Sequence, residues 1–313
     1  MSVKSIEIAS FENYGRCVKI TNGTVSAIVT ADLGPRILFY GYEGGENVLH
    51  LDLNRDTQWG GKSFDEYYFD GAKSYLYGGH RIWVTPESAP ETYYPDNTPV
   101  DIEYTDKGAV FTAPAQIKND IQISLEIEMA DEGTDMAVYN RVRNVGKTAK
   151  EFAVWTVSVM CKGGVEIIPH NTNDTGYLHN RVLTMWAYTN PNDYRFYNGK
   201  KYMTVKQDGT ANSSFKVGYN NRSGTAVYAA KKTVFIKRRA VDHDSLTYPD
   251  GGSSFETYTG AGVLELEMLD SVRNVAAGEQ SELKEYWSLA QHDCIPDPRS
   301  DDEIDKFYTK YVK

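Results

Sequence analysis

The feature that most constrains the fold is a period-two alternation of apolar and polar residues between positions 121 and 129. Apolar and polar side chains take turns along this stretch, which reads Ile121, Gln122, Ile123, Ser124, Leu125, Glu126, Ile127, Glu128 and Met129. Successive side chains of a β-strand point to opposite faces, so the pattern predicts a strand with one buried and one solvent-facing face. Repeated along a chain, such segments favour antiparallel sheets packed as a sandwich or barrel.

Further strands are predicted along most of the chain, but only one helix. The strand candidates are Val25–Thr30, Arg36–Tyr42, Ala137–Val145, Phe152–Met160, Phe215–Tyr219, Ala226–Ala230, Val234–Arg239, Gly262–Met268 and Leu283–Leu289. The helix lies at the end of the chain, where Ser300 and Glu303 form a capping-box pattern and apolar residues then recur at helical spacing. We therefore expect an all-β fold with a short C-terminal helix, and we expect residues 1–313 to form one domain.

Charge and composition narrow the range of partners. The formal net charge of −10 argues against nucleic acid and anionic membranes, because both require a basic surface. The sequence has no apolar run long enough to span a membrane and no apolar signal-peptide core, so we expect a cytoplasmic protein. Its three cysteines have neither zinc-binding spacing nor the pattern of a disulfide framework. No metal-binding motif is present, so we expect no metal or cofactor, and a Ca²⁺ site assembled from distant oxygen ligands stays open as an alternative. A homodimer stays open as an alternative to a monomer.

The first candidate site lies in residues 52–99, a stretch rich in Gly, Pro, Tyr and Trp that is too long for a hairpin loop. Long irregular segments of compact β domains often build binding sites. A glycine pair in this stretch precedes His80, Arg81 and Trp83. These three offer a proton donor near neutral pH, hydrogen-bond donors for hydroxyl groups and a face on which a sugar can stack. The alternative is a structural turn that leads into a strand.

A pair of carboxylates forms the second candidate. Strand periodicity puts Glu265 and Glu267 on one face of residues 264–268 and the apolar residues on the other. Because neighbouring like charges repel, one of these carboxyls is expected to have a raised pKa and to serve as a base. Glu256, in the aromatic stretch before them, is a candidate for substrate binding. A solvent-exposed polar face is the alternative.

A third group of candidates for substrate binding combines aromatic and basic residues. Its members are His170, Arg181, Trp186 and Tyr188. Each of them taken singly is also typical of a structural contact. Lys237 is a further candidate, because it could hold one phosphate of a sugar together with Arg81 and Arg238.

The order of several motifs resembles galactose mutarotase-like proteins, and more closely an uncharacterised branch of that superfamily. The resemblance covers the chain from about residue 20 to residue 290. The motifs are Leu33-Gly34-Pro35-Arg36-Ile37, Gly78-Gly79-His80-Arg81-Ile82-Trp83 with Pro86-Glu87, Val182–Tyr188, Phe235-Ile236-Lys237-Arg238, Tyr248–Gly252, Leu264–Met268, Gly278-Glu279 and Glu285-Tyr286-Trp287.

This resemblance implies a large antiparallel β-supersandwich with a cleft for a mono- or oligosaccharide. In the mutarotases, a carboxylate near the C-terminal end takes the proton of the anomeric hydroxyl, and a histidine protonates the ring oxygen. The carboxylate motif maps onto Leu266-Glu267 or, with a shift of two residues, onto Leu264-Glu265, and the sequence leaves both open. The family's glycine pair maps onto Gly78-Gly79, which makes His80 and Arg81 site candidates.

The chain departs from the family at one functional position. True mutarotases carry an Asn-His pair on a central strand, whereas the corresponding residues 153–157 here contain no histidine. The general acid would then have to be His80, His170 or another group.

Three hypotheses about function follow. The leading one is an aldose 1-epimerase-like isomerase that uses His80 with Glu265 or Glu267. The second is a carbohydrate-binding protein without catalytic activity, and the third is a polysaccharide lyase or glycoside hydrolase accessory domain.

Overall fold

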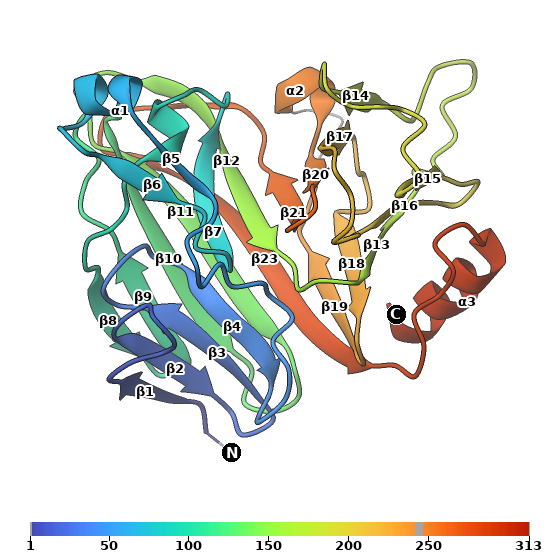
Figure 1. Cartoon of the computed structure of the whole chain (residues 1–313), viewed down its shortest axis with the longest axis horizontal. Coiled ribbons are helices and arrows are strands. Elements are labelled where there is room, and N and C mark those ends of the chain that lie inside the picture. The colour runs from blue at the N-terminus through green and yellow to red at the C-terminus, as the bar shows by residue number, and fades with distance from the viewer. Residues whose placement is uncertain (1, 242–246, 313) are drawn as a thin grey trace.

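The computed structural model describes residues 2–241 and 247–312, and it is dominated by two large antiparallel sheets (Figure 1). In the order in which they pair, the strands of the first sheet are β1 (Lys4–Ile8), β2 (Cys17–Thr21), β3 (Val25–Thr30), β4 (Ile37–Tyr42), β7 (His80–Thr85), β12 (Lys150–Val159), β21 (Leu264–Leu269), β20 (Phe255–Thr259), β17 (Phe215–Tyr219) and β14 (Leu183–Met185). The short strand β22 (Arg273–Val275) also pairs with β12.

The second sheet contains the alternating strand from which the fold was predicted. In order of pairing, its strands are β15 (Phe196–Asn198), β16 (Tyr202–Lys206), β13 (Val165–Pro169), β18 (Thr225–Ala230), β19 (Thr233–Arg238), β23 (Gln280–Gln291), β11 (Met136–Asn144), β10 (Ile121–Met129), β9 (Gly108–Thr112) and β8 (Asp101–Thr105). One apolar core draws residues from both sheets, such as Val18 and Ile82 from the first and Leu125 and Phe235 from the second.

Helices are few and short. They are α1 (Lys62–Tyr67), α2 (Pro249–Gly252) and α3 (Asp301–Tyr311), and a 3₁₀ turn covers Glu91–Tyr93. At the start of α3, the Ser300 side chain accepts a hydrogen bond from the backbone N–H of Glu303, so the predicted cap is confirmed. The described residues contain no helix whose length and apolar character would let it cross a membrane. The predicted all-β sandwich with a C-terminal helix is confirmed.

Residues 52–99, which were predicted to be irregular, contain several short elements. They fold into β5 (Gln58–Gly60), α1, β6 (Lys73–Tyr75), β7 and the 3₁₀ turn, and β5 pairs with β6. Gly78 and Gly79 both have positive φ, and a Cβ on them would lie 2.1 Å from the His50 carbonyl oxygen and 2.3 Å from that of Ile37. Close packing of the backbone therefore accounts for this glycine pair, with no ligand involved.

The centre of the first sheet places the predicted site segments on neighbouring strands. The register aligns Arg81 of β7 with Val157 of β12, Val157 with Glu267 of β21, and Glu267 with Glu256 of β20. Since side chains alternate along each strand, these positions share the face that is turned away from the second sheet. Segments far apart in the sequence thus meet on one face.

Candidate functional site

The candidate site consists of two adjoining cavities on this face of the first sheet, which we call the first and the second cavity. The first has a volume of about 390 Å³ and is lined by Thr57, Trp59, Leu76, Trp83, Glu87, Tyr93, Trp155, Tyr188, Lys216, Tyr258, Gly260–Val263 and Glu265. The second has a volume of about 340 Å³ and is lined by Thr85, Pro86, Glu87, Ala89, Tyr93, Trp155, Trp186, Lys216, Asp250 and Glu256. Because four residues line both, the cavities form one cleft of the size that small ligands occupy.

Aromatic rings form much of the wall of the first cavity. The rings of Trp83 and Trp155 lie 5.0 Å apart on neighbouring strands. The ring of Trp59 stacks on Tyr93 at 4.5 Å and meets Trp83 edge-on at 6.2 Å. Trp59 and Tyr93 both come from residues 52–99, so this segment supplies one side of the cleft and the sheet supplies the other.

Lys216 is the cation at the centre of the cleft. Its Nζ lies 2.8 Å from Oε2 of Glu256 and 3.4 Å from Oε2 of Glu267, and its exposed fraction is only 5%. The same Nζ lies 4.8 Å from the ring centre of Trp155 and 4.6 Å from that of Trp186. Two carboxyl groups and two indole rings therefore surround a single ammonium group.

The three glutamates around this lysine have raised pKa values. Burial raises the pKa of Glu265 to about 8, and the nearby Glu267 adds to the rise. Burial likewise raises the pKa of Glu256 to about 9, although Lys216 opposes the shift. For Glu267, burial raises the pKa while Lys216 and a hydrogen bond from Trp155 lower it. Burial alone would lower the pKa of Lys216, but Glu267 and Glu256 together raise it.

Glu265 and Glu267 have different surroundings, although they share a strand face. Glu265 is partly exposed, lines the first cavity and forms no hydrogen bond or ion pair with any described residue. Glu267 is fully buried, and its Oε2 accepts a hydrogen bond of 2.7 Å from Trp155 Nε1–H and lies next to Lys216. Glu265 is thus the carboxyl that a ligand can reach, and Glu267 holds Lys216 in place.

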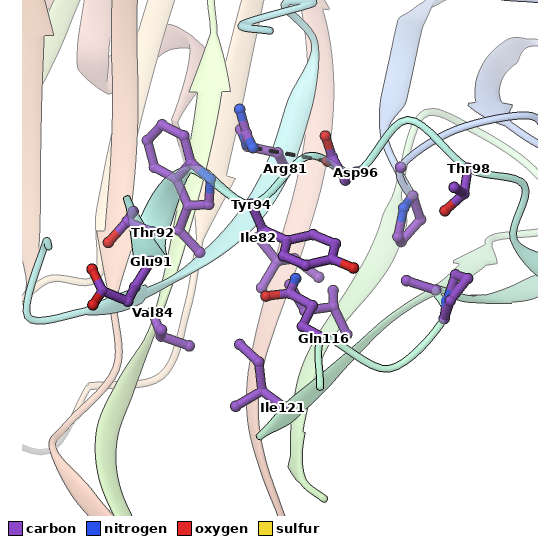
Figure 2. Close-up of a pocket in the computed structure, with 16 residues that line it drawn as sticks. Arg81, Ile82, Val84, Glu91, Thr92, Tyr94, Asp96, Thr98, Gln116 and Ile121 are labelled. Atoms are coloured by element: carbon purple, nitrogen blue, oxygen red, sulfur yellow. Dashed lines mark ion pairs between the residues drawn. The ribbon is translucent and has the colours of Figure 1, made fainter. Parts of the chain in front are cut away.

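Arg81 supports the aromatic wall from behind and lines neither of the two cavities. Its guanidinium carbon lies 4.0 Å from the ring centre of Trp83, and one of its nitrogens lies 3.8 Å from Asp96. Both Arg81 and Asp96 line a separate small cavity, which has a volume of about 30 Å³. Figure 2 marks the ion pair between them. Asp96 also forms a 2.8 Å ion pair with the buried Arg36. Arg81 therefore holds Trp83 in place, with its own charge paired to Asp96.

His80 occupies a different position from the one expected. Because side chains alternate along β7, His80 points toward the second sheet, while Arg81 lies on the opposite face of the first sheet, the face that carries the cleft. The His80 ring is fully buried and hydrogen-bonds Ser158 Oγ at 2.9 Å and Asn140 Oδ1 at 2.8 Å. The strand β7 thus separates His80 from the cleft that contains Glu265, so His80 cannot exchange a proton with a ligand bound there.

Lys237, expected to bind substrate, also lies between the sheets. It is fully buried, and its Nζ lies 3.0 Å from Oε1 of Glu285 and 3.0 Å from Ser158 Oγ. The phosphate-binding group suggested for Arg81, Lys237 and Arg238 is therefore not assembled. Lys237 lies on the face of β19 that is turned toward the first sheet, between the two sheets. A strand pattern alone does not show which face of a strand is turned inward.

His170 and Arg181 line neither cavity. His170 is buried at the end of β13, where its Nε2 lies 3.1 Å from the Gly199 carbonyl oxygen. Arg181 is exposed, and its guanidinium donates a hydrogen bond to the Lys200 carbonyl. Of the remaining candidates, Trp83, Trp186, Tyr188, Glu256 and Glu265 line the cleft, and Glu267 lies directly behind it.

Sequence analysis did not name as site candidates several aromatic and charged residues that line the cleft, among them Trp59, Glu87, Tyr93, Trp155, Lys216, Asp250 and Tyr258. A signal for Lys216 exists in the alternation of β17, where Phe215 and Val217 belong to the core and Lys216 must face away from it. A charged residue in the middle of a buried strand is uncommon without a partner or a function. Within the described residues, no group of His, Cys, Asp and Glu side chains is arranged to hold a metal ion.

We expect the contribution of His80 to the free energy of unfolding to decrease by about 3 kcal/mol as the pH falls from about 6.5 to about 4. Burial lowers the pKa of His80 to about 4, so over this range the unfolded chain binds a proton that the folded chain excludes. Urea unfolding at several pH values measures the effect. The variant His80→Gln should lose this part of the pH dependence, and an unchanged slope in the variant would contradict the assignment.

Comparison with known proteins gives structural similarity only. No protein-family model matches the chain, and no curated protein is similar to it in sequence. A galactose mutarotase-like protein from Lactobacillus casei is 12% identical with a TM-score of 0.54, over 88% of this chain and 100% of that chain. A candidate aldose 1-epimerase from Klebsiella pneumoniae is 10% identical with a TM-score of 0.53, over 98% of this chain and 86% of that chain.

A longer protein contains the same fold as a part. A TPR-domain containing protein from Parabacteroides distasonis is 15% identical with a TM-score of 0.53, over 89% of this chain and 48% of that chain. The present chain thus spans about half the length of that protein. Together with the sheet order, these similarities show that the chain has the galactose mutarotase-like β-sandwich fold.

Proposed function

We propose that this protein binds a sugar in the cleft and interconverts its anomers by acid–base ring opening. The observation that carries the proposal is Glu265, a carboxyl with a pKa raised to about 8 and with no hydrogen bond or ion pair to any described residue, on the wall of a cavity lined by aromatic rings. A group with a pKa near the working pH is suited to giving and taking protons.

Two further features favour a sugar as the ligand. Indole and phenol rings present apolar faces with polar edges, which suits sugars because their rings have both apolar C–H faces and hydroxyl groups. Trp59, Trp83 and Trp155 provide such faces around the first cavity. The chain also shares its fold with proteins described as galactose mutarotase-like or as a candidate aldose 1-epimerase, a similarity that supports the ligand class by analogy.

The mechanism uses two carboxyl groups of the first cavity. Glu265 is protonated at neutral pH and gives its proton to the ring oxygen of the sugar. Glu87, whose Oε1 accepts a hydrogen bond from the Tyr93 hydroxyl, takes the proton from the anomeric hydroxyl. The bond between the anomeric carbon and the ring oxygen breaks and leaves an open-chain aldehyde. After rotation about the neighbouring C–C bond, the reverse transfers close the ring with either configuration.

NMR saturation exchange between anomers tests the proposal directly. The full chain is added to a panel of neutral hexoses and pentoses, and the exchange rate is compared with that of buffer and of heat-inactivated protein. We expect acceleration for at least one sugar, with saturation at high sugar concentration. No acceleration with any sugar of the panel would overturn the catalytic part of the proposal.

A second candidate function is carbohydrate binding without catalysis. It is favoured by one observation: among the described residues that line the cleft, none is a histidine. This alternative predicts saturable heat of binding in calorimetry with a sugar whose anomers do not exchange faster. The same panel therefore distinguishes the two functions.

Replacing Trp59 with alanine is expected to weaken sugar binding by about tenfold, which corresponds to the loss of one aromatic contact of about 1.4 kcal/mol. Trp59 is only partly buried, so the fold should tolerate the change. Calorimetry measures the dissociation constant. Phe69→Ala is the matched control, because Phe69 lies in the same segment, is 61% exposed and does not line the cleft. Equal affinities of the two variants would contradict the proposed binding surface.

A further inference from the structure

We propose that the second cavity binds an ammonium group, so that the preferred ligand of the cleft is an amino sugar. This inference rests on the proposed function, because it takes the sugar ring to lie in the first cavity. It goes beyond that function by naming a charged substituent and the residues that recognise it, Glu87, Asp250 and Glu256.

The charges of the second cavity are unbalanced. Glu87 and Asp250 line it beside Glu256, whose raised pKa keeps it protonated and neutral at pH 7, whereas Lys216 is the cation among the described residues of its wall. Lys216 must also balance Glu267, which lies behind the wall at 3.4 Å. A ligand that carries a positive charge would complete the pairing, whereas an anionic ligand would add to the repulsion.

The floor of the cavity contains an oxygen without a partner. Glu256 is only 1% exposed, its Oε2 is paired with Lys216, and its Oε1 forms no hydrogen bond with any described residue. Asp250 is exposed at the mouth of the cavity, and its carboxylate likewise has no hydrogen bond or ion pair with described residues. Buried acceptors are costly when left unsatisfied, so a donor from a ligand is favoured here.

The aromatic walls of the cavity already hold a cation. Lys216 Nζ lies within 5 Å of the ring centres of both Trp155 and Trp186, and both rings line the cavity. Indole faces attract ammonium groups through their quadrupole, and the attraction is largest where water is excluded. The second cavity thus combines the two features that recognise an amine, which are carboxylates and aromatic faces.

Binding of an amine should also release a proton. The pKa of Glu256 is raised to about 9 by burial, so at pH 7 its carboxyl is protonated in the empty cleft. A nearby ammonium group favours the ionised form and displaces that proton. Proton release is a signature that a neutral sugar would not produce.

Calorimetry at pH 7 with three matched ligands tests the inference on the full chain. The ligands are a hexosamine, its N-acetyl derivative and the parent hexose, taken for both the gluco and the galacto series. We expect the hexosamine to bind about tenfold more tightly than the other two, a difference of about 1.4 kcal/mol. Repetition in two buffers with different ionisation enthalpies measures the proton release.

Two variants locate the ammonium group. Asp250→Asn should weaken hexosamine binding about two- to fivefold, as expected for one exposed ion pair, and leave the parent hexose unaffected. Asp250 has a φ of 50°, a conformation that asparagine adopts as readily as aspartate, so the fold should be preserved. Glu256→Gln should abolish the proton release. Asp131→Asn, in the turn between β10 and β11, is the control and should change neither the ligand affinities nor the proton release.

The possible outcomes separate this inference from the proposed function. Equal or tighter binding of the parent hexose would overturn the inference and leave the proposed function standing. Methylammonium chloride that binds as tightly as the hexosamine would also overturn it, because the cavity would then recognise a cation and no sugar. If no ligand of any class binds, both proposals fail.

Discussion

Replacing Glu265 with glutamine is expected to slow anomer exchange by about 10²- to 10⁴-fold, the usual contribution of general acid–base catalysis. Glutamine keeps the shape and polarity of glutamate but cannot give up a proton to the ring oxygen. Because the Glu265 carboxyl has no hydrogen bond or ion pair with any described residue, the change breaks neither kind of contact with them. NMR saturation exchange measures the rate, and sugar affinity measured by calorimetry should stay within a few-fold of the original.

The pH profile gives a second measure of the same role. The acid form of Glu265 is lost as the pH rises through its pKa of about 8, so the exchange rate should decrease above that pH. This decrease should be absent from the residual activity of Glu265→Gln. Glu103→Gln, on the exposed edge strand β8, is the matched control and should keep the full rate and profile. A Glu265→Gln protein with an unchanged rate would exclude Glu265 as the acid.

The strand pattern predicted more of the fold than of the site. Strand 121–129 has the predicted bounds, and its side chains alternate strictly between buried and partly exposed positions. Strands 25–30 and 215–219 also have the predicted bounds, although all of their residues are buried. Two strands of the site, β12 (150–159) and β21 (264–269), are shifted by one or two residues from the predicted ranges 152–160 and 262–268. Both strands, like β7, carry buried side chains on both faces. The sequence of a strand that is covered on both faces does not alternate in polarity, so its bounds are difficult to predict from the sequence.

The position of His80 shows that neighbouring residues of one sequence motif can lie on opposite faces of a sheet. In the sequence, His80, Arg81 and Trp83 form one compact group, and the family resemblance treats them as one. In a strand, however, neighbouring residues point to opposite faces, so His80 and Arg81 cannot face the same cavity. Once residues 80–85 are assigned to a strand, the separation follows from geometry. Which of the two faces carries the cleft depends on the second sheet, and the local sequence does not contain that information.

The buried polar groups between the sheets form a second network, distinct from the cleft. Lys237 pairs with Glu285, Ser158 bonds both Lys237 and His80, and Thr156 donates a hydrogen bond to Glu285. Burial acts to raise the pKa of Glu285, but Lys237 and His80 lower it by more than burial raises it. The pKa is therefore below its usual value, and the carboxylate is ionised. These groups come from strands of both sheets, and their mutual satisfaction fixes how the sheets face one another.

Replacing Lys237 with methionine is expected to reduce the free energy of unfolding by about 3–5 kcal/mol, because it leaves the Glu285 carboxylate buried without its counter-ion. Both side chains are fully buried, so water cannot screen the loss. The double variant Lys237→Met with Glu285→Gln should recover much of the stability, since the unpaired charge is gone. Unfolding in guanidinium chloride measures the free energy of unfolding of the original protein, the single variant and the double variant. The exposed Lys232→Met, in the turn between β18 and β19, is the control. A stable Lys237→Met protein that no longer bound sugar would instead assign Lys237 to the ligand site.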